Sequence, residues 1–166
     1  MTERESLIDI IKENALLTGS FRVRKRKTNY FINLFNITTF PHYLSLIVDI
    51  LSDELKNEKM DKLASPSIES EPIVTAVSLK LKVPFVCIRK NREVYGVIEP
   101  HKMYIIVADV SMSGKTILDA ANLIRGGGGE VLKAYTLIDR DQGACNRIEK
   151  EGIKFNSIIK LDELIT

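Results

Sequence analysis

A short run of hydroxyl, glycine and lysine residues follows the most apolar segment of the chain. That segment, residues 103–110, reads MYIIVADV. The run after it consists of Ser111, Met112, Ser113, Gly114, Lys115 and Thr116. A glycine lets the backbone approach a ligand closely, and N–H groups at the start of a following helix attract an anion. With its hydroxyls and its lysine charge, the run predicts a phosphate-binding turn.

Two other interpretations of this run are open. A nucleoside-triphosphate loop also ends in Gly-Lys-Thr, but it needs a second glycine five positions before Gly114. The chain has Asp109 there, and its carboxylate would repel a triphosphate. The run can also be a plain strand-to-helix turn with a capped helix and no ligand.

Strands and helices alternate around this turn. Residues 103–109 predict a buried strand, 116–125 a helix and 130–139 a second strand, which is the strand–helix–strand pattern of a parallel sheet. Ligands of such sheets bind at the carboxyl ends of the strands, where the turn lies. The remaining helices are expected over residues 41–56, 73–81 and 141–151, and the remaining strands over 62–64, 83–89 and 155–159, with an edge hairpin over 93–98.

The first 40 residues have a different pattern. Leu7, Ile10 and Ile11 share one face of a predicted helix that runs through Leu17 and ends at Gly19. Residues 21–34, FRVRKRKTNYFINL, predict two short strands and a turn.

The turn of this hairpin carries five positive charges between positions 22 and 27, at Arg22, Arg24, Lys25, Arg26 and Lys27. The cluster fits a solvated turn, and it also fits contact with nucleic-acid phosphates, with Tyr30 and Phe31 stacking on bases. No second basic stretch supports nucleic acid as a partner, so we do not expect it.

Composition narrows the function classes. The chain has 166 residues, 45% hydrophobic and 28% charged, with a net charge of +2, which indicates one globular domain. No apolar run reaches the ~18 residues of a membrane span. Cys87 and Cys145 form no close pair, and His42 and His101 are isolated, so neither a disulfide scaffold nor a metal site is expected. A reducing cytoplasm fits this cysteine usage.

Four segments in the same order resemble the type I phosphoribosyltransferase family, and within it the orotate phosphoribosyltransferase branch. IIVADVSMSGKT resembles the motif that binds 5-phosphoribosyl-1-pyrophosphate (PRPP), and VPFVCIRKNREVYG resembles the strand, Arg-Lys pair and start of the mobile catalytic loop. LIDIIKENALLTGSFRV with TNYFIN resembles the N-terminal helix and hood, and LIDRDQGACNRIEKEGIKFNSIIKLDELI resembles the C-terminal part. The resemblance implies an α/β fold, a central parallel sheet flanked by helices, with a hood over residues 1–40 and a core over 41–166. It also implies a homodimer.

The resemblance also implies a role for each motif residue. Asp109 would hold the ribose hydroxyls, and residues 111–116 would hold the 5-phosphate. Arg89 and Lys90 would hold the pyrophosphate.

At the base, Arg140 would contact the orotate carboxylate, and Lys27 or Arg26 would contact the ligand. For Arg140, a surface arginine paired with Asp139 or Asp141 is an equal alternative. The implied reaction joins orotate or a related base to PRPP, with Mg²⁺, and releases pyrophosphate in pyrimidine nucleotide biosynthesis. The implied ligands are PRPP or a nucleoside 5′-monophosphate.

Four departures from the family pattern concern the chemical step. Ala108 replaces the first acid of the PRPP motif, and Glu93 and Tyr95 stand at the catalytic Lys and His positions of the mobile loop. That loop is short, with six residues, 97–102, between Gly96 and the next strand. Ser65, Glu69 and Ser70 stand where the pyrophosphate loop has glycines. Two functions therefore stay open: an impaired orotate phosphoribosyltransferase, or a non-catalytic nucleotide-binding or regulatory protein on the same fold.

Overall fold

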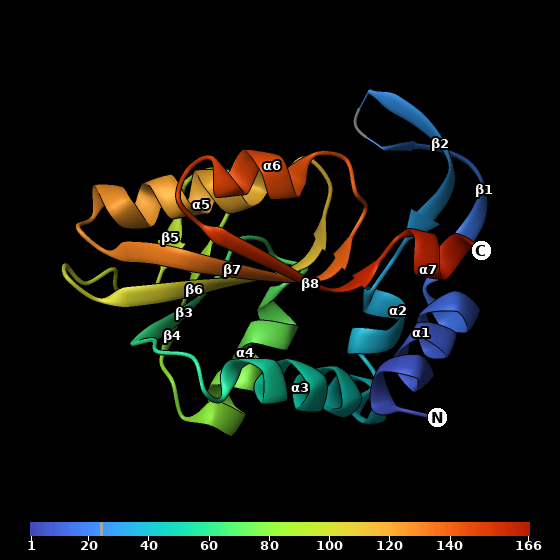
Figure 1. The fold of residues 1–166 in the computed structure, drawn as a ribbon, viewed down its shortest axis with the longest axis horizontal. Helices are drawn as coiled ribbons and strands as arrows, with labels where there is room; N and C mark the ends of the chain where they lie inside the picture. The colour runs from blue at the N-terminus through green and yellow to red at the C-terminus, as the bar shows by residue number, and fades with distance from the viewer. Residues whose placement is uncertain (24) are drawn as a thin grey trace.

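A computed structural model describes residues 1–23 and 25–166 (Figure 1). Arg24, one member of the basic cluster, lies outside the described residues. Among these residues, the centre of the molecule is a six-stranded sheet in the order β5-β4-β3-β6-β7-β8. Its strands are β3 (Lys62–Ser65), β4 (Phe85–Ile88), β5 (Val94–Tyr95), β6 (Met103–Ser111), β7 (Glu130–Asp139) and β8 (Lys154–Lys160).

Strand β6 lies in the middle of this sheet, as its apolar sequence predicts. It pairs in parallel with β3 on one side and β7 on the other, and residues 104–108 are all buried. β4 runs parallel to β3, and β5 pairs antiparallel with β4 as the expected edge hairpin. The expected central parallel sheet is confirmed. The carboxyl ends of β3, β6 and β7 lie side by side at one edge of it.

Helices cover both faces of the sheet (Figure 1). α3 (Pro41–Leu55) and α4 (Glu71–Leu81) pack on one face, and α5 (Lys115–Gly126) and α6 (Ala144–Glu149) pack on the other. Helix α6 is shorter than the expected 141–151, because Asp141 has a φ of 51°, which a helix does not allow. Residues 140–143 instead form a turn that leads away from the end of β7.

The N-terminal helix ends earlier than predicted. α1 (Glu3–Asn14) is followed directly by strand β1 (Leu16–Val23), which pairs antiparallel with β2 (Arg26–Ile32). Leu16 and Leu17 therefore belong to the hairpin, where Ile32 and Phe31 lie opposite them. Strand pairing gives their backbone groups partners that a last helical turn would lack.

The hairpin stands apart from the large sheet, at the end of the molecule that holds both termini (Figure 1). Leu7 and Ile11 of α1 are fully buried in the same core as α3. The short helices α2 (Phe35–Thr38) and α7 (Asp162–Ile165) lie at this end as well. The boundary at residue 40 stays a prediction. No described helix is long and apolar enough to cross a membrane.

The four glycines after α5 offer a matched test of the packing. A Cβ on Gly129 would lie 2.7 Å from Ile124 Cγ2 and 2.9 Å from Cε2 of the buried Tyr104, whereas a Cβ on Gly126 would meet nothing within 4 Å. We expect Gly129→Ala to lower the free energy of unfolding by about 1–3 kcal/mol, because a packed core resists added volume. Gly126→Ala should leave it unchanged or raise it by up to about 1 kcal/mol. Urea titration measures both, and equal effects of the two substitutions would contradict the packing.

Candidate functional site

A cavity of about 310 Å³ opens at the carboxyl ends of β3 and β6. Five parts of the chain line it: the hairpin, the loop after β3, the turn after β4, the end of β6 with the turn that follows, and the residue after β7. Its lining consists of Val23, Phe31, Ile32, Pro66, Ser67, Glu69, Lys90, residues 108–117 and Arg140. The fold therefore brings together Asp109, the turn 111–116, Lys90 and Arg140, which the sequence separates.

The turn after β6 forms a cradle for an anion. Gly114 has φ 80° and precedes α5, and a Cβ there would lie 3.0 Å from Ile148 Cδ1 on α6. The first hydrogen bond of the helix runs from the Leu118 N–H to the Gly114 carbonyl, at 3.0 Å. The N–H groups of residues 115–117 thus precede this ladder, at the cavity. Such groups, with the helix dipole behind them, favour a phosphate.

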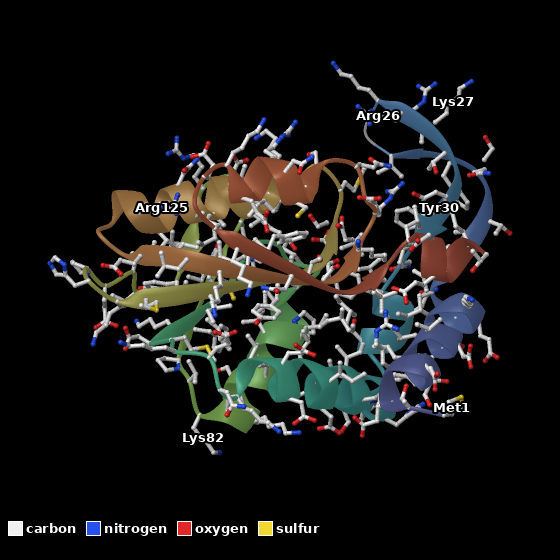
Figure 2. All side chains as sticks on the ribbon, viewed as in Figure 1. Met1, Arg26, Lys27, Tyr30, Lys82 and Arg125 are labelled. Carbon is white, nitrogen blue, oxygen red and sulfur yellow. The ribbon has the colours of Figure 1, made fainter. Side chains whose placement is uncertain are left out.

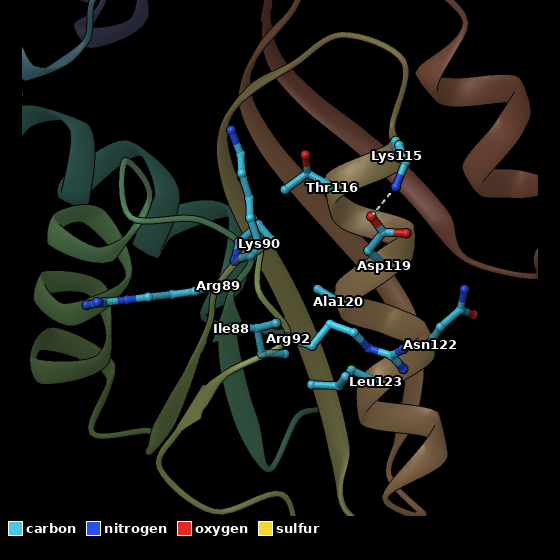
Figure 3. Close-up of a pocket in the computed structure, with 11 residues that line it drawn as sticks. Ile88, Arg89, Lys90, Arg92, Lys115, Thr116, Asp119, Ala120, Asn122 and Leu123 are labelled. Atoms are coloured by element: carbon cyan, nitrogen blue, oxygen red, sulfur yellow. Dashed lines mark hydrogen bonds and ion pairs between the residues drawn. The ribbon is translucent and has the colours of Figure 1, made fainter.

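The Ser111 hydroxyl is further evidence for a bound phosphate. It is buried, and it has no hydrogen-bond partner among the described residues. An unsatisfied buried hydroxyl costs about 1–3 kcal/mol, which an oxygen of a bound ligand would remove. The Lys115 ammonium group instead pairs with Asp119 at 2.6 Å, one turn along α5 (Figure 3).

Asp109 is held by the loop after β3. Its carboxylate accepts a hydrogen bond from the Ser70 hydroxyl at 3.1 Å, and its N–H donates to the same oxygen at 3.2 Å. The Ser67 hydroxyl lies 2.8 Å from that of Ser70, and Ser65 donates to the Ser67 carbonyl at 2.8 Å. Burial raises the pKa of Asp109, the nearby charge of Glu69 raises it further, and the hydrogen bonds oppose both. Ser65 and Ser70, which stand where the family has glycines, therefore belong to a hydrogen-bonded chain that connects this loop to Asp109.

Arg140 is a buried cation, with 6% of its surface exposed. Its Nε donates to the Tyr30 hydroxyl at 2.9 Å, its guanidinium carbon lies 4.6 Å from the centre of the Tyr30 ring, and its Nη1 donates to Met112 Sδ at 3.3 Å. It is therefore not a surface arginine. Among the described residues no carboxylate forms an ion pair with it.

The basic pair after β4 is divided. Arg89 points toward α4, where its Nε and Nη2 contact the two Glu71 carboxylate oxygens at 3.1 and 3.3 Å (Figure 3). The hydrogen bond to Glu71 raises the pKa of Arg89, and the guanidinium also lies 4.6 Å from the Tyr95 ring centre. Lys90 lines the cavity.

A second cavity of about 610 Å³ lies between the end of β4, with the turn that follows it, and α5 (Figure 3). It shares Pro66, Lys90, Lys115 and Thr116 with the first, so the two adjoin. Arg92 lines only the second of these two cavities, and Glu93 accepts a hydrogen bond from the Tyr95 hydroxyl at 2.8 Å.

The hairpin contributes Val23, which the sequence did not single out, and Tyr30, which the sequence suggested only as a base-stacking residue. Lys27 is exposed and points outward with Arg26, and neither lines the cavity (Figure 2). Val23 lines it instead, and Tyr30 holds Arg140. Burial alternates along β2, with Tyr30 on the same face as Ile32. The sequence does not show this alternation, because Tyr30, Phe31 and Ile32 are three consecutive apolar residues, and only the strand geometry assigns Tyr30 to the inner face.

Comparisons with known proteins agree with this geometry. The chain is similar to the orotate phosphoribosyltransferase of Methanosphaera stadtmanae, with 31% identity over 169 residues, 96% of this chain and 95% of the relative. It is 31% identical over 173 residues to that of Methanocaldococcus jannaschii, covering 99% and 98%. Among solved structures it resembles Mycobacterium tuberculosis orotate phosphoribosyltransferase in complex with PRPP, with TM-score 0.84, 22% identity and coverage of 98% and 99%. No protein-family model matches the chain. The expected fold is confirmed.

The raised pKa of the half-buried Asp109 carboxyl predicts a pH-dependent gain in stability when its charge is removed. Because its folded-state pKa is raised, the wild type loses stability as pH rises from the unfolded pKa toward the folded one. Asp109→Asn should therefore be more stable than the wild type at pH 7, and the difference should vanish below about pH 4. Urea titrations across this range measure it, with Asp53→Asn, at an exposed position of α3, as the control. The raised pKa of Asp109 would be contradicted if Asp109→Asn were less stable than the wild type at pH 7, or if its gain in stability grew as the pH fell.

Proposed function

The chain belongs to the orotate phosphoribosyltransferase family, and on that premise we propose that its cavity binds a 5-phosphorylated ribosyl ligand together with orotate or a related base. One observation carries the proposal. A single cavity is lined at once by the anion cradle after β6 and by a buried arginine without a carboxylate partner among the described residues. PRPP bound together with orotate, or a nucleoside 5′-monophosphate with an acidic base, presents a phosphate to the cradle and a carboxylate to the arginine.

The contacts suggest how the ligand would lie. The N–H groups of residues 115–117 and the Ser111 hydroxyl receive the 5-phosphate, and Asp109 receives the ribose hydroxyls. Arg140 receives the carboxylate of the base, and Lys90 the pyrophosphate. Arg89 could help only after leaving Glu71. Lys27 has no place in this arrangement, because it lies outside the cavity lining.

Mg²⁺ fits the same site as a companion of the pyrophosphate. Glu69 lines the cavity, and its charge acts on Asp109, so two carboxylates face the region where a pyrophosphate would lie. Oxygen donors of this kind suit Mg²⁺, which binds through one or two carboxylates and substrate phosphates. Among the described residues no group of three or more His, Cys, Asp or Glu converges. When bound, the ion would offset the negative charge of the leaving group.

We further propose that transfer to orotate is slow. Ala108 offers no carboxylate, Glu93 replaces a lysine and is held by Tyr95, and Arg89 is held by Glu71. Loss of one catalytic donor commonly costs ~10²–10³ in rate, and such losses are not additive. The contacts of Glu71 and Ser70 also favour a second candidate, a protein that binds the nucleotide without reacting, because both residues engage groups that catalysis would need free.

Calorimetry and a turnover assay test this function together. We expect PRPP and orotidine 5′-monophosphate to bind, PRPP more tightly with Mg²⁺, and orotidine 5′-monophosphate to form at less than about 1 s⁻¹, below the ordinary enzyme range. Gly114→Val, whose side chain would press on Ile148 and displace the turn, should abolish binding, whereas the distant Gly126→Ala should not. Turnover in the ordinary range would refute slow transfer, binding with no turnover would favour the second candidate, and absence of binding would refute both.

We also propose a homodimer, as the family resemblance implies. Static light scattering at micromolar concentration should give twice the chain mass of 18.7 kDa. Dilution series in the presence and absence of PRPP show whether the ligand affects association. A mass near that of one chain at every concentration would contradict the dimer.

A further inference from the structure

We propose that Tyr30 is a positioning residue that holds Arg140 ready to recognise a carboxylate on the base of a 5′-nucleotide. This inference rests on the proposed function and deepens it. Tyr30 lies on β2 of the hairpin, 110 positions from Arg140 in sequence, and touches it through both its ring and its hydroxyl.

The surroundings of Arg140 leave its charge available. Both side chains that hold it, Tyr30 and Met112, are neutral, and no ion pair joins it to a carboxylate among the described residues. Asp139 and Asp141 flank Arg140 in sequence, and Asp139 accepts a hydrogen bond from the Asp141 N–H at 3.0 Å. A buried charge without a counterion is unfavourable, so this site is built for an anion that arrives with the ligand.

The unused donors of Arg140 define the chemical class of that anion. A guanidinium has five N–H donors, and the two contacts use Nε and one hydrogen of Nη1. Nη2 has no hydrogen-bond partner among the described residues, so its two N–H groups and the second one of Nη1 are left for a ligand. Two parallel N–H groups on one edge match the two oxygens of a planar carboxylate. A nucleotide whose base carries a carboxylate is the fitting ligand, and one without it leaves the charge uncompensated.

Tyr30 is the contact that fixes the direction of this edge. Its hydroxyl accepts a hydrogen bond from Nε, and the centre of its ring lies 4.6 Å from the guanidinium carbon. Met112, the other contact, belongs to the turn that forms the phosphate cradle. The base end and the phosphate end of the cavity are thus connected through Arg140, and Tyr30 ties both to the hairpin.

Orotidine and uridine 5′-monophosphates isolate this interaction, because they differ only by the carboxylate. We expect the wild type to bind the orotidine nucleotide more tightly in calorimetry. Tyr30→Leu, which removes ring and hydroxyl, should reduce the ratio of the two Kd values about tenfold, as expected for a hydrogen bond to a charged group. Tyr30→Phe, which keeps the ring, should retain part of the preference. The Kd for uridine 5′-monophosphate should stay within about twofold in both variants.

Tyr43→Phe is the matched control, since Tyr43 lies on α3 beside His42 and outside the cavity lining. It should leave both Kd values unchanged. If Tyr30→Leu kept the full preference for the orotidine nucleotide, the inference would be overturned and the proposed function would stay intact. If Tyr30→Leu weakened the binding of both nucleotides equally, the effect would be a general structural one, and the inference would be overturned as well. Equal affinities in the wild type would overturn the role of Arg140, and failure of both nucleotides to bind would overturn the proposed function as well.

Discussion

The close contact between the turn at Gly114 and helix α6 is the constraint on which the site depends. A side chain there would be strained, because its Cβ would lie 3.0 Å from Ile148 and the backbone adopts a positive φ. This contact lets α5 begin directly after the buried strand β6, with its first N–H groups at the cavity. It also brings α6 beside the turn, so that the chain between β7 and α6 passes the cavity and presents Arg140. The phosphate cradle and the arginine are consequences of one packing arrangement.

Residues in the loop that departs from the family pattern form specific hydrogen bonds in this structure. Ser70 and Glu71 are consecutive, and they bind Asp109 and Arg89 respectively. A loop that could have been flexible with glycines is therefore fastened to the acid of one strand and to the arginine of another. This fastening leaves the phosphate cradle and Arg140 untouched, so the features for binding are kept apart from those for pyrophosphate departure. Release of the loop would free both the acid and the arginine at once.

Much of the fold could be predicted from the chain, because its signals are local. The buried strand, the glycine turn and the amphipathic helix after it are encoded within residues 103–126, and the structure confirms each. Contacts over long separations could not be predicted. Ser70 and Asp109 are 39 positions apart, and sequence spacing said nothing of their hydrogen bond. The Arg89-Lys90 pair shows a further limit, since these adjacent basic residues, in the turn after β4, point in different directions and only Lys90 lines the site cavity.

A crystal structure with orotidine 5′-monophosphate tests the central claim most directly. The account predicts the phosphate at the N–H groups of residues 115–117, about 3 Å from the nitrogen atoms, and the base carboxylate on the Nη1–Nη2 edge of Arg140. A nucleotide bound in the reverse orientation, with its phosphate at Arg140, would contradict the account. A nucleotide bound outside this cavity, with the turn at Gly114 empty, would contradict it as well.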